Sequence, residues 1–161
     1  MINLFLLILY FYFPSISYAS INITPDFLLI MIIINSFYLI DSKILLLGFS
    51  IGLLKDFLTH SDYLGFLTLV TLFFAYVLTK IQSYKNKNIQ YVYILCLMFI
   101  YFFINYFLKY SESYFFYFQF SLIQCVTTIF TLFIFKIIFN ERFKKNWDII
   151  KTQILIKEKK L

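Results

Sequence analysis

The chain has 161 residues, of which 62% are hydrophobic and 24% aromatic, a composition too apolar for a soluble domain of this size. We therefore expect an all-α, polytopic membrane helix bundle with about six segments. The net charge of +6 does not indicate nucleic acid, because the basic residues lie in two short clusters beside apolar runs. Cys96 and Cys125 lie within apolar segments and predict neither a disulfide nor a metal site, and we expect no cofactor.

The first apolar stretch, residues 2–23, carries no charge and is long enough to span a membrane. Residues 17–19 resemble a signal-peptidase site, but no positive residues precede them, which favours an uncleaved first helix. Thr24, Pro25 and Asp26 then predict a helix start, because Thr24 can cap, Pro25 suits the first helical position and Asp26 complements the positive helix end.

Five further helical segments are predicted at residues 27–40, 44–58, 63–79, 89–108 and 114–139. Asp41 or Ser42 is expected to cap the third segment. The second and third segments are short, and Asn35 interrupts the second, so they either cross fully or form a re-entrant hairpin covered by neighbouring protein. Residues 1–139 thus form the membrane bundle, and residues 140–161 a separate tail.

The tail holds seven of the fourteen basic residues. Its apolar residues recur at helical spacing among lysines, including Lys144 and Lys145, which favours an amphipathic helix on anionic lipid headgroups with Trp147 at the interface. A solvated tail is the alternative. By the positive-inside rule, this tail and the lysines at 80, 85 and 87 lie in the cytoplasm. The resulting expectation is a multi-pass membrane protein with both termini cytoplasmic.

The three glycines of the chain lie between residues 48 and 65. Gly48, Gly52, Asp56 and His60 follow one another at four-residue steps, which places them along one helix face. The two glycines predict close approach of another helix. An aspartate within a membrane helix costs about 2.5–3.5 kcal/mol, so Asp56 should face protein or water and have a partner. Residues 55, 60 and 62 are the nearest candidates.

The last predicted segment carries a stripe of hydroxyl and amide groups spaced three and four residues apart, which predicts one helix face. Such a stripe faces either a partner helix or an internal cavity. The stripe consists of Tyr114, Tyr117, Ser121, Gln124, Thr128 and Thr131. A transporter-like cavity would be lined by Asp56, Asn105, Gln124 and Thr128.

Residues 24–70 resemble the MreD family of bacterial rod shape-determining proteins. The matching residues are Thr24-Pro25-Asp26, then Gly48 and Gly52 followed by Leu-Leu-Lys-Asp56, then Leu64-Gly65. Lys55 departs from that pattern, in which glutamine is commoner. The resemblance implies that Pro25 and Asp26 start a helix, that Gly48 and Gly52 allow close packing, that Asp56 anchors a polar contact and that Gly65 begins the next helix.

The same resemblance implies a non-enzymatic membrane component of the elongation complex that directs lateral peptidoglycan synthesis. Its implied partners are MreC, the cytoskeletal protein MreB directly or through MreC, RodA with its transpeptidase, and membrane lipids. It also implies a fold similar to the substrate-binding subunits of vitamin transporters, and a small-molecule or lipid-binding transporter subunit is the alternative function. The sequence has none of the common catalytic motifs, and a hydrated loop is the expected environment of its single histidine, His60.

Overall fold

The computed structural model describes residues 2–14, 16–18, 21–59, 65–82, 84, 86–109 and 113–138. Within these residues the chain is helical, as predicted, and it also contains one small antiparallel sheet of two strands. The elements in chain order are α1 (Ile2–Tyr12), β1 (Ile16–Tyr18), β2 (Ile21–Ile23), α2 (Phe27–Ser36), α3 (Asp41–Thr59), α4 (Phe66–Gln82), α5 (Lys87–Lys109) and α6 (Tyr114–Ile138).

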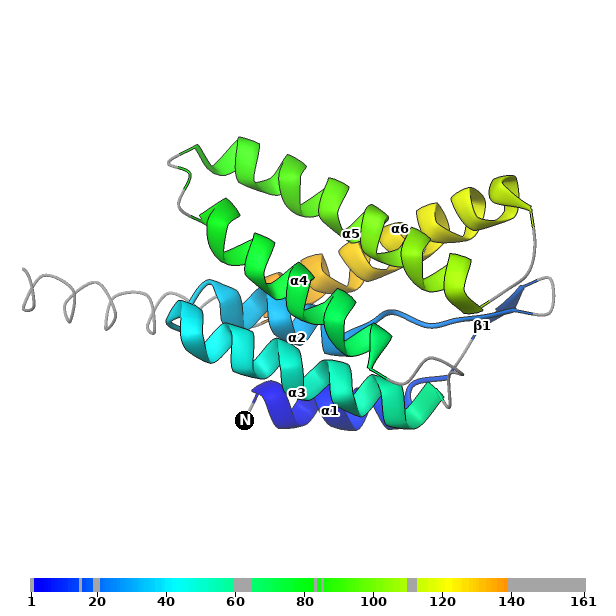
Figure 1. Ribbon diagram of the computed structural model, residues 1–161, viewed down its shortest axis with the longest axis horizontal. Coiled ribbons are helices and arrows are strands. Elements are labelled where there is room, and N and C mark those ends of the chain that lie inside the picture. The colour runs from blue at the N-terminus through cyan, green and yellow to red at the C-terminus, as the bar shows by residue number, and fades with distance from the viewer. Residues whose placement is uncertain are drawn as a thin grey trace, which may run out of the picture.

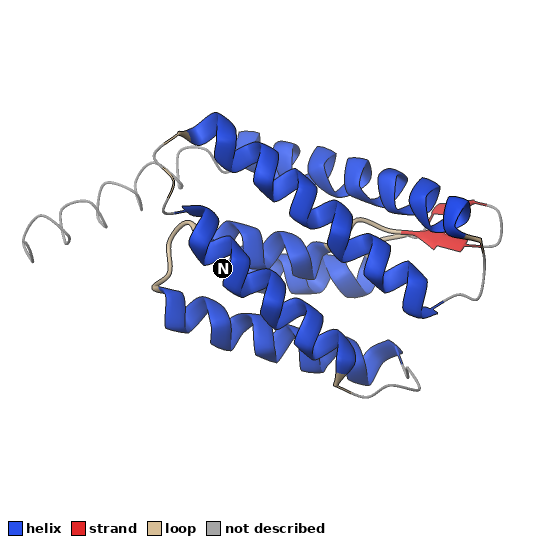
Figure 2. Cartoon of the chain, turned by 45° about the horizontal axis from the view of Figure 1, so that its top comes forward, coloured by secondary structure: helices blue, strands red, loops and turns tan. Residues whose placement is uncertain are grey.

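The prediction of one spanning helix over residues 2–23 is wrong. Helix α1 ends at Tyr12, and the chain continues as the hairpin of β1 and β2, in which Ile16 pairs with Ile23. Pro14 explains the break, because proline lacks a backbone N–H and disfavours helical geometry in the residue before it. The hairpin extends from one end of the bundle (Figure 2).

The predicted bounds of the other helices differ from the observed ones by a few residues. Helix α2 is shorter than predicted, because residues 37–40 form a turn, and α3 is longer. The cap of α2 is Asp26 and not Thr24, since the Asp26 carboxylate accepts a hydrogen bond from the Leu29 N–H at 2.9 Å. Neither Asp41 nor Ser42 precedes α3, which begins one turn earlier than expected, with the Ile40 carbonyl accepting from the Ile44 N–H.

Helix α2 lies in the middle of the bundle, where it contacts α1, α3, α4 and α6 (Figure 1). Eight of its ten residues are buried, which explains how so short an apolar helix is stabilised. Helix α1 lies at the periphery, and α5 pairs with both α4 and α6. The turns between α2 and α3 and between α4 and α5 lie at the same end of the bundle, which we call the lysine end after Lys43 and Lys80; the hairpin lies at the far end.

The outer surface of the bundle is largely apolar. Large hydrophobic side chains are exposed on every helix except α2, among them Leu46 on α3, Phe73 on α4 and Phe130 on α6. Of the side chains that the structure describes, every exposed charged one lies in the first or last turn of a helix: Asp41, Lys43, Lys80 and Lys136. Of the described charged groups farther inside, Lys55 and Asp56 are buried and Asp26 is mostly buried.

Two helices of the described chain are long and apolar enough to cross a membrane, namely residues 88–108 of α5 and Tyr114–Ile138, which is α6. Only 28% of the most apolar window of each is buried inside the bundle. This low burial separates them from the core helices of soluble proteins, which are covered on most sides. Helices α1, α2 and α4 are apolar but shorter.

Candidate functional site

The closest helix contact in the bundle lies between α3 and α4, at the two glycines of α3. A Cβ atom added at Gly52 would lie 2.1 Å from the Thr71 Oγ1 and 2.5 Å from the Thr68 Cα. One added at Gly48 would lie 2.6 Å from the Cβ of Ala75. Because both positions leave no room for a side chain, the backbones of α3 and α4 approach as closely as small residues in membrane helices allow. The glycine face is therefore occupied by a helix of the same chain.

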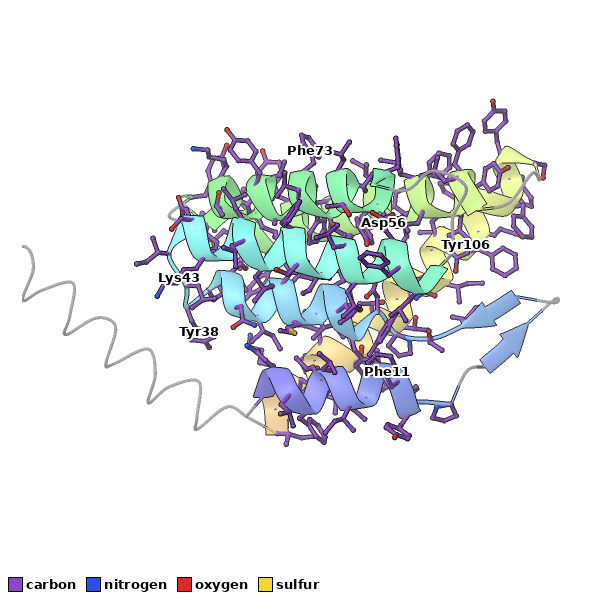
Figure 3. All side chains as sticks on the ribbon, turned by 60° about the horizontal axis from the view of Figure 1, so that its bottom comes forward. Phe11, Tyr38, Lys43, Asp56, Phe73 and Tyr106 are labelled. Atoms are coloured by element: carbon purple, nitrogen blue, oxygen red, sulfur yellow. The ribbon has the colours of Figure 1, made fainter. Side chains whose placement is uncertain are left out.

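Asp56 lies one turn beyond Gly52 and binds the first turn of α4. It is 2% exposed, and Figure 3 shows it on the side of α3 that faces α4. Its carboxylate accepts hydrogen bonds from the backbone N–H groups of Gly65, Leu67 and Thr68 at 3.0–3.2 Å, and from the Thr68 hydroxyl. These N–H groups have no partner within their own helix, and the positive end of the helix dipole favours a negative charge there.

Gly65 has a positive φ of 91°, a conformation that residues with side chains rarely adopt. It turns the chain into α4 so that its own N–H reaches the Asp56 carboxylate at 3.1 Å. Asp56 therefore acts as the N-terminal cap of α4, supplied by a different helix.

Lys55 points to a different part of the bundle from Asp56. Its ammonium group forms an ion pair with the carboxylate of Asp26 and donates a hydrogen bond to the Tyr101 hydroxyl at 2.8 Å. The side chain of Lys55 is 9% exposed and that of Asp26 12%, so the pair is largely removed from solvent. The expectation that Lys55 is a partner of Asp56 is thus not met, and residues 60 and 62 lie outside the described residues. Lys55 joins the start of α2 to α3 and α5.

The polar stripe of α6 faces the segment that leads into α2. The Gln124 amide donates to the backbone carbonyl of Thr24, and the Thr128 hydroxyl accepts from the Asp26 N–H at 3.4 Å. Tyr106 of α5, labelled in Figure 3, donates to the Gln124 side-chain oxygen at 3.4 Å. Residues 24–26 are extended backbone inside the bundle, where unpaired polar groups are costly, and α6 supplies their partners.

The other predicted polar residues bond within their own helices. The hydroxyls of Ser121 and Thr131 donate to carbonyls of α6, and the Asn105 amide donates to the Tyr101 carbonyl at 2.7 Å. Pro25 is buried beside Asp26. Trp147, Lys144 and Lys145 lie in the tail, outside the described residues, as does the proposed amphipathic helix.

The structure thus brings together residues that are far apart in the sequence. Lys55 and Asp56 are buried and Asp26 is mostly buried, and each of these charged side chains is held by named partners from other elements. Tyr101 and Tyr106 could not be singled out from the sequence, because they are two among fourteen tyrosines. Among the described residues no group of three or more His, Cys, Asp and Glu side chains could hold a metal ion. The described polar groups named above bind protein groups of neighbouring elements.

Comparisons with models of known protein families, with curated proteins and with solved structures find no match.

Proposed function

We propose that the chain is a multi-pass protein of the bacterial inner membrane whose lysine end faces the cytoplasm. The apolar outer surface and the position of the exposed charges at helix ends support membrane insertion. Helices α1, α3 and α5 run away from the lysine end and α2, α4 and α6 return to it, which agrees with cytoplasmic termini and six crossings. The positive-inside rule supports the orientation.

Within that membrane, we propose a non-enzymatic scaffold role in the elongation complex, as in the MreD family. In this role the chain binds MreC and helps to couple MreB to lateral peptidoglycan synthesis by RodA and its transpeptidase. One observation carries the proposal: residues of the resemblance lie close together in space, joined in part by Lys55, which departs from the family pattern. Asp26 pairs with Lys55, Gly52 packs on Thr68 and Asp56 caps the helix that Gly65 opens.

This convergence explains why separate short motifs occur together in one chain. A Pro-Asp pair, a glycine pair followed by Lys-Asp, and a Leu-Gly pair are each unremarkable alone. Here the ion pair of Asp26 with Lys55 joins the Pro-Asp pair to the glycine segment. The Asp56 cap joins the glycine segment to Gly65, so each motif contacts another. Such a rigid polar centre suits a protein that acts by holding partners in place.

A transporter cavity is less well supported than the scaffold role, because its four candidate residues already have protein partners. Asp56 is bonded to α4, Asn105 to the Tyr101 carbonyl, and Gln124 and Thr128 to residues 24–26.

Depletion of the protein in its own host tests the scaffold role. We expect rod-shaped cells to become round, and the rod shape to return with the wild-type chain or with Ser50→Leu, which changes an exposed position of α3. The Gly52→Leu chain should not restore it, because α3 and α4 cannot then pack. Crosslinking of the tagged wild-type chain in membranes should recover an MreC homologue. Unchanged cell shape on depletion, with no MreC recovered, would overturn the proposal.

A further inference from the structure

The helices of the bundle differ in length: α1 and α2 are short, and α6 is long. At the lysine end, α1 and α2 are joined by a reciprocal amide pair, in which the Asn35 Nδ2 donates to the Asn3 Oδ1 at 2.8 Å. At their other ends the rings of Phe13 and Phe27 are 5.0 Å apart. Helices α1 and α2 therefore cover the same height of the bundle, measured along the helix axes. This height is about 15 Å for ten residues at a rise of 1.5 Å per residue.

The long helix α6 shows where this short pair ends within the bundle. The Asp26 N–H, at the start of α2, bonds to Thr128 in the middle of α6. From Thr128 to Tyr114, α6 continues for fourteen residues, about 21 Å, toward the far end. Over the same height, toward the far end, the chain preceding α2 is the hairpin of β1 and β2 and residues 24–26 instead of helix (Figure 1).

Residues 13–26 are poorly suited to contact hydrocarbon. Strand β1 pairs only with β2 in the described sheet, so its other edge presents backbone N–H and C=O groups that need partners. The sequence of this segment also contains Ser15, Ser17, Ser20 and Asn22. Immediately before it, Tyr12 is 83% exposed, and tyrosine is enriched at membrane–water interfaces.

We propose that phospholipid headgroups and water reach the level of Tyr12 beside α1. The membrane leaflet at the hairpin end of the bundle would then be depressed locally around α1. The headgroup phosphates and their water would supply the hydrogen-bond partners of the hairpin edge, while α5 and α6 cross a bilayer of ordinary thickness. A helix that is too short for the bilayer draws the leaflet toward it at a modest free-energy cost per ångström. This inference rests on the proposed membrane placement and not on the cell-shape role.

Two exposed positions at about the same height form a matched test. Tyr12 at the end of α1 and Val126 on α6, two residues from Thr128, are 83% and 64% exposed. In a Cys96→Ser, Cys125→Ala background, single Tyr12→Cys and Val126→Cys chains would be spin-labelled and reconstituted in vesicles of phosphatidylcholine and phosphatidylglycerol. Phe11→Cys, also on α1, provides a second label should the first destabilise the chain.

Collision rates with a water-soluble nickel chelate and with molecular oxygen then report the surroundings of each label. We expect several-fold more collision with nickel at position 12 than at position 126, and the reverse with oxygen. Oxygen-dominated collision at both positions would overturn the depression but keep the membrane placement. A label at position 12 that is shielded from both reagents would mean that polypeptide covers this face, and would also overturn it. Nickel-dominated collision at both positions would remove the membrane placement itself.

Discussion

The contact between α3 and α4 and the contact between α2 and α6 both bury polar groups, but with different chemistry. At α3–α4 the helices touch through glycines, and a full carboxylate, Asp56, binds several N–H groups of one helix terminus. At α2–α6 neutral side chains, Gln124 and Thr128, bind single backbone groups of an extended segment. The charged carboxylate lies where a helix end offers several N–H donors and a favourable dipole. Neutral side chains form hydrogen bonds with isolated backbone groups.

Lys55 and Asp26 connect these two contacts. Asp26 caps α2 next to Thr128, and Lys55 is the residue before Asp56. The ion pair therefore fixes the start of α2 against the end of α3 that also caps α4. A change at the glycine contact should therefore unfold the bundle. The loss of one member of the ion pair should be partly offset by removing the other, and a change at the neutral contact should cost the least stability.

The largest effect is expected for Gly52→Leu. Even a Cβ atom at this position would lie 2.5 Å from the backbone of Thr68, so a leucine forces α3 and α4 apart and removes the Asp56 cap as well. We expect loss of the monodisperse peak when a fluorescent fusion is extracted in detergent and run on size exclusion. Ser50→Leu, at an exposed position on the same helix, should keep that peak. A folded Gly52→Leu protein would show that the close approach is not required.

Lys55→Met should destabilise the protein by about 3–5 kcal/mol, because it leaves the largely buried Asp26 carboxylate without its ion-pair partner. Asp26→Asn retains a capping side chain for α2 while removing the charge. The double variant should therefore be more stable than Lys55→Met alone. Unfolding of the four proteins in detergent gives the coupling free energy between the two positions. A coupling near zero would mean that the two charges act independently.

The next largest effect is expected for Asp56→Asn, about 3 kcal/mol. The amide retains one acceptor oxygen but directs an NH2 group at the N–H donors of α4, which then lack a partner. Asp41→Asn is the matched control, because that carboxylate is exposed in the first turn of α3 and contributes only about 0.5 kcal/mol. Thermal unfolding in the same detergent compares the two. An equal loss of stability in the two variants would mean that the Asp56 cap of α4 contributes no more than an exposed charge.

The sequence predicted the residues of the α3–α4 contact more accurately than it predicted the bounds of the helices and strands. The scarcity of glycine identified Gly48 and Gly52, and the cost of a membrane carboxylate identified Asp56, because both arguments depend on a single residue. The partners of these residues were not predictable, since Lys55–Asp26 and Gln124–Thr24 join positions 29 and 100 residues apart. A local pattern contains no information on which distant segment it meets.

The hairpin and the half-length helix α1 were missed for a different reason. Residues 2–23 are uncharged throughout, so hydropathy alone extends one helix across Pro14. The serines that follow that proline, together with the proline itself, were the available signal for a break. The stripe on α6 was found by its spacing, but its target, the extended backbone of residues 24–26, depended on knowing that α1 stops early.

The smallest effect is expected for Gln124→Leu, which should lower the free energy of unfolding by about 1–2 kcal/mol. A side-chain hydrogen bond between membrane helices contributes less to this free energy than an unpaired buried charge subtracts from it. The Thr24 carbonyl and the Tyr106 hydroxyl lose a partner, while the ion pair and the Asp56 cap remain. Thermal unfolding should place this variant between wild type and Asp56→Asn. Leu122→Ala, exposed on the same helix, controls for α6 itself. If Gln124→Leu were as damaging as Lys55→Met, the contact of α2 with α6 would be as essential as the charged one, and the distinction between them would fail.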